Sequence, residues 1–244
     1  MIVSVDAKSL EWCTYLYLSQ DPVGIEEWHG VLNDPSKYDI HKANQEAFNL
    51  PSRLVAKRFL FRWIYFGSAF AYSRDPDFMS VSKKVDFWQD VIDKYYSKYK
   101  NIKKTHNRLI KEAVTTNKVV SPFGREYYYE PRKNYKGELV WSESDITNWI
   151  NQGCGADVMA VARVALFQRW KRNEMKGQLI STVHDSIVAD VPSNEVDQTV
   201  LMFDKIFRDL PGLVTKAYGV EWNVPMLGEV SVGPNFLDLE EVKL

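Results

Sequence analysis

The chain has only two cysteines among its 244 residues, Cys13 and Cys154, and neither stands in a spacing that suits a metal site. We therefore expect reduced thiols in a cytosolic compartment rather than a disulfide framework. Apolar runs of membrane-spanning length are missing, and the N-terminus lacks a basic region followed by an apolar one. These absences argue against a membrane-spanning protein and a disulfide-stapled secreted domain, and they predict a soluble intracellular protein.

An overall excess of charge is also missing, because 31 Lys and Arg face 32 Asp and Glu. The charge is nevertheless unevenly distributed. Residues 53–136 carry 19 Lys and Arg against 8 Asp and Glu, whereas residues 177–244 carry 4 against 11. A basic middle would attract phosphates, and an acidic end would concentrate charge that binds cations. Chance patterning of solvated helix faces is the alternative interpretation.

Hydrophobic periodicity and turn residues predict an α+β chain with a helical middle. Strands are expected at residues 2–6 and in hairpins over 119–129 and 179–191. Helices are expected over 10–18, 40–49, 52–71, 154–175 and 194–210, with one or two more over 81–116. Turns and short helices are expected over 19–40. The pattern predicts a helical insertion, roughly residues 40–136, set into an α+β body.

Two acids end short apolar runs at opposite ends of the chain. Asp6 follows Ile2-Val3-Ser4-Val5, and Asp185 lies between two apolar stretches, next to His184. Brought to ~4 Å, two such charges would repel by about 4 kcal/mol at an effective dielectric of ~20, so the pair calls for a divalent cation. A neutral His184 bonded to nearby backbone and a metal-ligating His184 both stay open.

Between the acids lies a predicted helix on which cations precede aromatics. Arg53, Lys57, Phe61 and Tyr65 step by four residues, so they form one slowly winding stripe. The cations suit a triphosphate, and the aromatics suit a sugar and a base. The alternative is an ordinary helix with Phe61 and Tyr65 in the core. The order acid, basic–aromatic helix, acid predicts a nucleotidyl transferase.

A third segment, residues 148–157, combines amides with glycines. Asn148 and Gln152 could donate to acceptors in a DNA minor groove, close to Gly153 and Gly155. A loop leading into the next helix, with Asn148 as its cap, is the alternative.

Taken together and in order, these segments resemble the palm and fingers of a family A DNA polymerase, the DNA polymerase I class, and most of all its phage replicative members. The matching segments are Asp6 to Trp12 (motif A), Asp39 to Arg53, Arg53 to Tyr65 (motif B), Val119 to Arg125, Gln152 to Asp157, Val183 to Asp185 (motif C) and Gly233 to Phe236. The resemblance implies an α+β polymerase palm, an antiparallel sheet with helices, into which a helical fingers subdomain is inserted. It places palm at 1–40 and 137–244 and fingers at 41–136.

The same resemblance implies template-directed DNA synthesis by two-metal-ion catalysis. It implies that Asp6, Asp185 and the Ala7 carbonyl hold two Mg²⁺. The triphosphate would be bound by Arg53, Lys57 and His41, with Lys57 also the candidate proton donor to the leaving pyrophosphate.

Selection of the nucleotide and contact with DNA are implied for further residues. Phe61 would pack on the sugar, and Glu11 with Tyr65 would exclude a 2′-hydroxyl, which favours dNTPs over rNTPs. The residues implied to contact primer–template DNA are Gln152 and Asn148 in the minor groove and His184 near the primer terminus.

Three positions depart from the family pattern. Ser186 stands where the family has Glu after the motif C Asp, so we expect a lower rate or altered fidelity rather than loss of the metal site. Phe66 precedes Gly67 where the family has Gly directly after Tyr65, and Ser144 stands where some members have Arg. A Ser after motif C also resembles single-subunit RNA polymerases, but Glu11 argues against an RNA polymerase or primase.

Motif A begins five residues after Met1, whereas in the family an exonuclease-like domain, the thumb and the first part of the palm precede it. We therefore expect one half of a split polymerase, which docks onto a separate chain carrying the thumb and the 3′–5′ exonuclease and acts in a cytoplasm, that of the host if phage-encoded. A fragment of a longer polymerase is one alternative. A non-catalytic DNA-binding or replisome subunit that keeps the fold is another.

Overall fold

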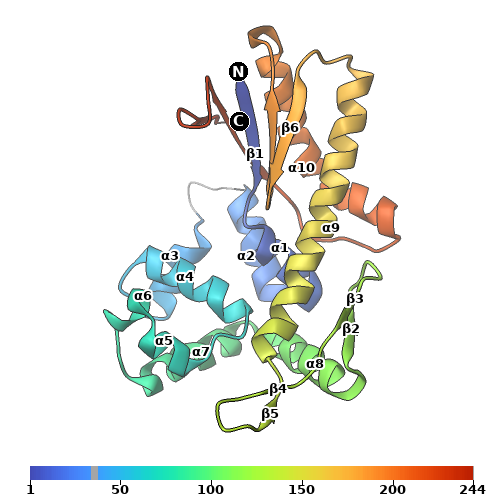
Figure 1. Cartoon of the computed structure of the whole chain (residues 1–244). Helices are drawn as coiled ribbons and strands as arrows, with labels where there is room; N and C mark the ends of the chain where they lie inside the picture. The colour runs from blue at the N-terminus through green and yellow to red at the C-terminus, as the bar shows by residue number, and fades with distance from the viewer. Residues whose placement is uncertain (34–37, 244) are drawn as a thin grey trace. The chain divides into compact units, whose positions relative to one another are not determined.

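The computed structural model describes residues 1–33 and 38–243 (Figure 1). Its elements, in chain order, are β1 (Ile2–Ala7), α1 (Leu10–Ser19), α2 (Pro22–Asn33), α3 (Ile40–Ala47), α4 (Arg53–Ile64), α5 (Ala69–Arg74), α6 (Pro76–Met79), α7 (Val85–Lys98), α8 (Lys100–Thr116), β2 (Lys118–Val120), β3 (Glu126–Tyr128), β4 (Arg132–Lys133), β5 (Leu139–Val140), α9 (Glu143–Arg172), β6 (Gln178–Val183), β7 (Ser186–Asp190), η1 (Ser193–Glu195), α10 (Val196–Tyr218), β8 (Gly228–Gly233) and β9 (Glu240–Glu241).

The chain divides into two compact units. One, here called the sheet unit, consists of Met1–Thr14 and Gly153–Leu244, and the other, the helical unit, consists of Tyr15–Gln152. These boundaries fall within α1 and α9 and differ from those predicted at residues 40 and 136. The palm and fingers assignment therefore stays a prediction, and residues 34–37 of the predicted first palm segment lie outside the described part of the chain.

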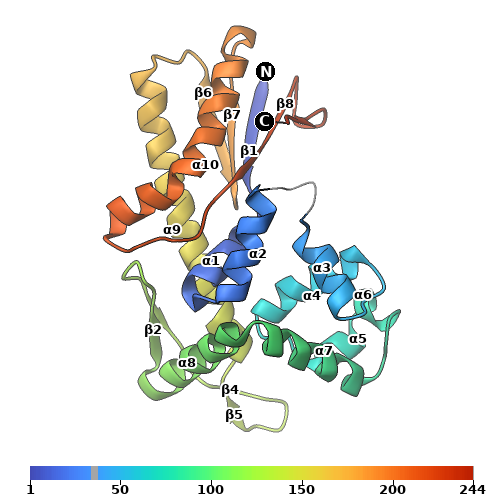
Figure 2. The ribbon, with the colours of Figure 1, turned by 180° about the vertical axis from the view of Figure 1, so that it is seen from behind.

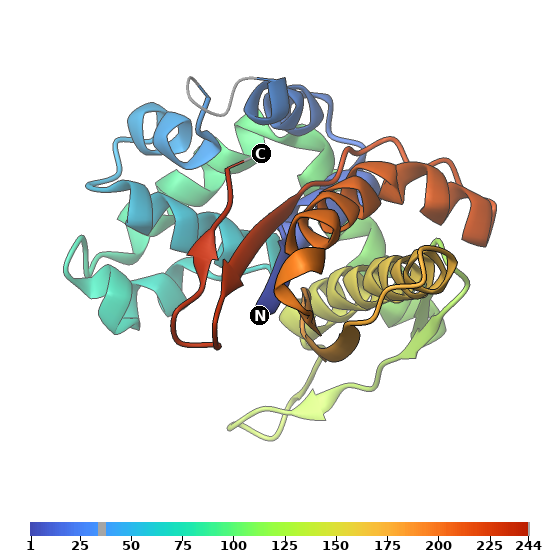
Figure 3. The same ribbon diagram turned by 90° about the horizontal axis from the view of Figure 1, so that it is seen from above.

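The sheet unit is built on an antiparallel sheet with the strand order β6-β7-β1-β8-β9. The central strand β1 buries alternate residues, Val3, Val5 and Ala7, as a two-residue repeat requires. Helix α10 covers this sheet and packs against β1 and β8 (Figures 2 and 3). At Gly228 a Cβ atom would come within 2.5 Å of Val5 and 2.9 Å of Phe207, so strand and helix approach too closely there for a side chain.

Strands β6 and β7 form the predicted hairpin around His184 and Asp185. Val183 pairs with Ser186, which leaves His184 and Asp185 as the two residues of the turn. His184 has a φ of 52°, in the left-handed region that such turns use. The hairpin prediction is confirmed.

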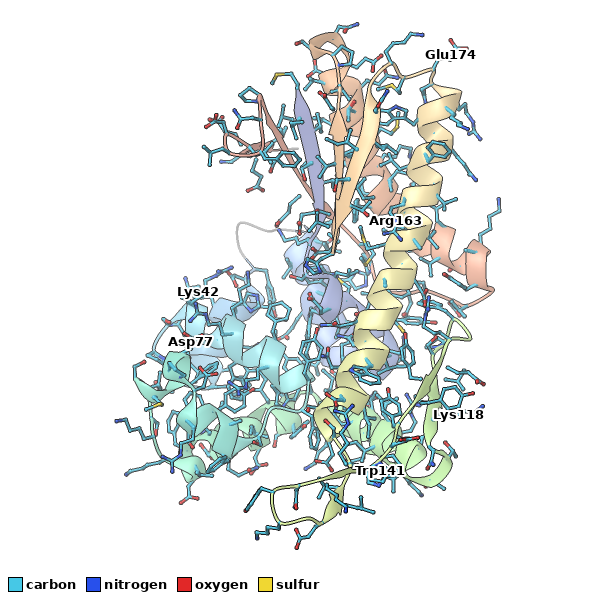
Figure 4. All side chains as sticks on the ribbon, viewed as in Figure 1. Lys42, Asp77, Lys118, Trp141, Arg163 and Glu174 are labelled. Atoms are coloured by element: carbon cyan, nitrogen blue, oxygen red, sulfur yellow. The ribbon has the colours of Figure 1, made fainter. Side chains whose placement is uncertain are left out.

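Aromatic side chains form the core of the helical unit. Phe59 and Trp63 of α4 are fully buried, and Phe59 stacks on Tyr72 and Trp88 with ring centroids 4.5 and 5.9 Å apart. A second cluster joins α8, β2 and the first turns of α9, near the labelled Lys118 and Trp141 in Figure 4. Its members are Leu109, Ala113, Val119, Tyr129, Ile146 and Ile150.

Two predicted helices end elsewhere in the structure. The helix expected over 52–71 ends at Ile64, because Phe66 adopts a φ of 62° and Ser68 caps a new helix, α5. Helix α10 continues through Pro211 to Tyr218 instead of ending near residue 210. Within residues 19–40, where turns and short helices were expected, the structure has the twelve-residue helix α2.

The helix expected over 154–175 begins at Glu143 instead, so the segment 148–157 is helical and the loop alternative is wrong. Gly155 within it has a packing role, since a Cβ there would lie 3.2 Å from Leu10. Across residues 1–33 and 38–243, none of the helices combines the length and the apolar character that crossing a bilayer requires.

Candidate active site

The antiparallel register brings the predicted acids to one end of the sheet. Asp6 pairs with Ser186 of β7 on one side and with Glu229 of β8 on the other. Next along β1, the Ala7 amide donates to the carbonyl oxygen of Asp185 at 3.0 Å. Asp6, Ala7 and Asp185 therefore lie together, as the sequence predicted.

The surroundings of Asp6 disfavour its ionised form. Although Asp6 counts among the exposed residues, partial burial of its carboxyl, followed by repulsion from Asp185, Glu229 and Glu11, raises its pKa to about 6. One cation lies in the same group, because Lys8 pairs with Glu229 at 2.9 Å. The site thus carries more negative charge than its own side chains neutralise.

This donor set fits Mg²⁺. Among the described residues, no three or more His, Cys, Asp or Glu side chains converge as a metal-ligand cluster. Mg²⁺ in nucleotide-transfer sites commonly takes one or two protein carboxylates and completes its shell with water and phosphate oxygens. Asp6 and Asp185 with a backbone carbonyl such as that of Ala7 match that need. Burial and then repulsion from neighbouring carboxylates raise the pKa of Asp6, and a divalent cation would offset the repulsion.

Two residues beside these acids have distinct local roles. The Ser186 hydroxyl donates to the Val183 carbonyl at 2.9 Å and so closes the hairpin turn. His184 is exposed at that turn.

Sequence reasoning missed Glu229. The alternating residues of the tail place it on one face of a strand, but only the pairing register shows that this face is opposite Asp6. A carboxylate on an alternating strand near the end of an acidic segment was the available signal.

In the helical unit, α4 presents the two cations of its predicted stripe away from its core. Ser52 caps the helix by accepting from the Val55 amide at 3.2 Å, as Pro51-Ser52 predicted. Arg53 and Lys57 are exposed, and Phe61 and Tyr65 are only partly buried. Phe61 and Tyr65 lie between the exposed cations and the buried Phe59 and Trp63, and the Tyr65 hydroxyl is itself buried, so the alternative that places the two aromatics in the core stays open.

Arg53 is held by an acid that also caps the neighbouring helix. Asp39 accepts from the amides of His41 and Lys42 at the start of α3, and it accepts from Arg53 Nε at 2.5 Å. Although partial burial opposes the shift, these hydrogen bonds, led by that from Arg53, lower the pKa of Asp39. This contact uses Nε of Arg53, and the two terminal nitrogens of the guanidinium carry the further N–H donors that a phosphate would need.

His41 of α3 lies next to Phe61, one of the four stripe residues of α4. It is buried, with its ring centroid 6.1 Å from that of Phe61. Burial lowers its pKa to about 4, and Arg53 and Lys57 add to that decrease against an opposing effect of Asp39. His41 is therefore neutral near pH 7, and it can offer a triphosphate a hydrogen bond but no positive charge.

Asn148 and Gln152 stand one helical turn apart on α9, within the helical unit. Gln152 is exposed, and Asn148 is partly buried, with no hydrogen-bond partner for its Oδ1 among the described residues. The two amides thus share a helix face, as minor-groove contact would need. Glu11 lies in the first turn of α1, in the sheet unit.

Comparison with known proteins identifies the fold. The chain superposes with a TM-score of 0.76 on a structure described as the POL domain of Pol1 from M. smegmatis in complex with DNA primer-template and dNTP. The two are 18% identical, and the match covers 95% of this chain and 39% of the other. The α+β fold is that of a polymerase domain.

The sequence model of the family described as DNA polymerase family A matches residues 1–238, and the chain belongs to this family. Relatives include DNA polymerase I of Caldicellulosiruptor bescii (27% identity, 76% of this chain and 20% of the relative) and of Pseudomonas aeruginosa (28%, 91% and 25%). The DNA polymerase of Bacillus phage SP01 is 24% identical over 84% of this chain and 23% of its own length. The chain thus spans about a fifth to a quarter of the length of these relatives.

Proposed function

We propose that this chain carries the nucleotidyl-transfer centre of a DNA-directed DNA polymerase, in which a primer 3′-hydroxyl attacks the α-phosphate of a dNTP. The observation that supports this most is the convergence of Asp6 and Asp185 at one sheet end, where burial and neighbouring carboxylates raise the pKa of Asp6 to about 6. When bound there, Mg²⁺ would lower the pKa of the attacking hydroxyl and offset charge on the transferred phosphoryl group.

Helix α4 supplies the nucleotide-binding residues in this proposal. Arg53 and Lys57, both exposed, bind the triphosphate, and Lys57 gives a proton to the leaving pyrophosphate. Neutral His41 adds a hydrogen bond. Phe61, which lies two turns after Arg53 on α4, packs on the sugar.

Glu11 and Tyr65 exclude the 2′-hydroxyl, so the enzyme selects dNTPs. Replacement of Glu11 by Ala is expected to raise rNTP incorporation strongly, measured as the ratio of kcat/KM for rNTP and dNTP. A small rise would instead favour an RNA polymerase or primase.

Primer–template DNA is the proposed macromolecular ligand. Gln152 and Asn148 contact its minor groove, and His184 lies near the primer terminus. The M. smegmatis relative is named as a complex with primer-template and dNTP, which supports DNA and nucleotide as ligands. Bacterial and phage enzymes are both among the relatives, so phage origin and action in a host cytoplasm stay predictions.

A separate chain that carries a thumb and a 3′–5′ exonuclease is the further partner proposed from the family resemblance. Primer extension would be compared for the purified chain alone and with a candidate second chain. Activity that requires the second chain supports a split enzyme. Activity of the chain alone contradicts that requirement.

The central test is primer extension with dNTPs and Mg²⁺ by the wild type and by Asp6→Ala. We expect extension to be abolished in Asp6→Ala, with DNA binding nearly unchanged. Extension that persists in Asp6→Ala would refute the metal assignment. A wild type that binds DNA but extends no primer, either alone or with the second chain, would instead indicate a non-catalytic DNA-binding subunit.

A further inference from the structure

The end of the nucleotide-binding helix α4 is fastened by a residue that the proposed chemistry does not use. Three backbone carbonyls near its C-terminus have partners outside the helix pattern. Arg62 accepts from the Gly67 amide at 3.0 Å, Trp63 accepts from the Phe66 amide at 2.9 Å, and Ile64 accepts from His106 Nε2 at 2.9 Å. The last carbonyls of a helix have no partners within it, so His106 supplies one that the turn itself does not.

His106 lies on α8, 42 residues further along the chain, and is completely buried. Its other ring nitrogen, Nδ1, lies 2.9 Å from the Tyr96 hydroxyl of α7. Because a carbonyl can only accept, Nε2 must carry the proton, and Nδ1 must then accept from Tyr96. One tautomer satisfies both contacts. The two hydrogen bonds, from Tyr96 to His106 and from His106 to Ile64, are here called the relay.

Protonation of the ring would break this relay, since both nitrogens would become donors. Burial lowers the pKa of His106 to about 4, so the ring is neutral at the pH of DNA synthesis. Neighbouring rings also fix its plane. Phe66 meets it at 90° with centroids 5.3 Å apart, and Tyr15 meets it at 62°, also at 5.3 Å.

The residues that follow Ile64 are the ones for which this anchoring matters. Tyr65 is the C-terminal cap of α4, and Phe66 holds a φ of 62°, which a bulky residue adopts only when its surroundings impose it. Tyr65, Phe66 and Gly67 line a cavity of about 690 Å³, together with Tyr96 and Trp141. Displacement of Ile64 would therefore move Tyr65 and one wall of this cavity.

We propose that His106 is a positioning residue that sets the orientation of Tyr65 through the Tyr96–His106–Ile64 relay, and thereby sets discrimination between deoxyribose and ribose. The proposal rests on the proposed function, in which Tyr65 helps to exclude the 2′-hydroxyl. His106 itself touches neither substrate nor metal. A purely structural His106 would affect folding but would leave sugar discrimination unchanged.

Two variants separate these roles. His106→Phe keeps an aromatic ring and removes both hydrogen bonds, and Tyr96→Phe removes only the hydroxyl that orients the ring. Leu109→Ala is the matched control, because Leu109 is buried on the same helix but belongs to the second core with Val119, Tyr129 and Ile146. It is expected to lower Tm without disturbing Ile64.

The first measurement is single-nucleotide incorporation, reported as the ratio of kcat/KM for dNTP and rNTP. We expect the ratio to fall about tenfold in His106→Phe, the size that follows from losing the buried hydrogen bond to the Ile64 carbonyl, and less in Tyr96→Phe, which keeps that bond. It should stay at the wild-type value in Leu109→Ala. An unchanged ratio in His106→Phe, or an equal fall in the control, would overturn the proposal.

The second measurement needs no catalysis. Nitrogen chemical shifts of the wild-type imidazole should show the Nε2–H tautomer, and amide exchange at Phe66 and Gly67 should accelerate in His106→Phe but not in Leu109→Ala. An Nδ1–H tautomer, or exchange unchanged in His106→Phe, would refute the relay. If the wild type incorporates no nucleotide either alone or with the second chain, the proposed function fails, and this measurement alone decides whether the two hydrogen bonds of His106 exist.

Discussion

Asp6 of β1 lies across from Glu229 of β8 in the antiparallel register, with Ser186 across from it on β7. The Glu229 carboxylate thus comes from the strand on one side of β1, whereas Asp185 comes from the β6–β7 turn on the other side. Glu229 is itself paired with Lys8, so its charge is partly compensated. Burial and the neighbouring carboxylates together disfavour the ionised form of Asp6.

Replacing Asp6 by Asn should stabilise the chain while abolishing extension. The folded-state pKa of about 6 exceeds the ordinary 3.8, so Asp6 costs stability above about pH 6, and this cost disappears as the pH falls toward 4. In EDTA at pH 8 we expect the free energy of unfolding to rise by roughly 1 kcal/mol, after allowance for solvent screening. Urea unfolding of both proteins measures the difference in the free energy of unfolding, which should be present at pH 8 and lost at pH 4.

With Mg²⁺ in place of EDTA, the wild type should become more stable than Asp6→Asn, because Mg²⁺ binds the folded wild type and stabilises it. Asp190→Asn, at the far end of β7, is the control and should show no Mg²⁺-dependent difference from the wild type. A wild type that stays more stable than Asp6→Asn in EDTA at pH 8 would contradict the prediction.

Replacing Glu229 by Gln should lower the pKa of Asp6, because it removes one of the repelling charges. The acid limb of the pH–rate profile for extension should then move to lower pH. A carboxyl carbon titration by NMR checks the same shift without catalysis. A profile displaced to higher pH would show that Glu229 does not repel Asp6.

Replacing Asp39 by Asn should tighten dNTP binding. The amide still caps α3 but no longer holds Arg53 by charge, so Arg53 is released toward the triphosphate. The pair is partly exposed, which limits the expected decrease in KM for dNTP to about fivefold, or ~1 kcal/mol. Asp39→Ala is the comparison, since it also removes the cap and should lower Tm. A KM that rises in Asp39→Asn would argue that the pair orients Arg53 productively.

Replacing Gly67 by Ala should destabilise the chain by about 1–3 kcal/mol, as overpacking does. Its Cβ would lie 2.9 Å from the Arg62 carbonyl oxygen and 2.9 Å from the Tyr72 hydroxyl, so the turn after α4 would have to shift. Gly212→Ala is the matched control, because a Cβ there meets nothing within 4 Å, and Ala should stabilise the interior of α10 by about 0.5–1 kcal/mol. Chemical denaturation of both variants measures the contrast, and equal effects would contradict it.

Replacing Lys104 and Lys111 by Gln should weaken the salt dependence of DNA binding. Both are exposed on α8, one face of which also carries Lys100 and Asn107. If each contacts one phosphate of a single strand, the slope of log K against log salt should fall by about 0.7 per contact. Fluorescence anisotropy over a salt series measures it, with Lys216→Gln on α10 as the control. A slope equal to that of the wild type would assign these lysines to a solvated surface.

Local patterns were sufficient to predict the elements that carry the candidate site. The alternation of Ile2 to Asp6 predicted β1, and apolar stretches around His184-Asp185 predicted the hairpin, because strands and tight turns depend on neighbouring residues. The helical spacing of Arg53 and Lys57 predicted that these two cations lie together on the exposed side of α4. The start of α9 was misjudged because Gly153 and Gly155 resemble loop residues until the packing of Leu10 against Gly155 is known.

The sequence by itself determined the family, the order of the motifs and the chemical groups available at each, since these depend on residue identity and short-range spacing. The tertiary structure alone decided that Glu229 lies across from Asp6, that Asp39 holds Arg53 and that His106 fastens the end of α4. The physical reason is that strand register, burial and the partner of a buried donor are set by segments distant in the chain. The pKa of Asp6 and the anchoring of Tyr65 both follow from those non-local choices.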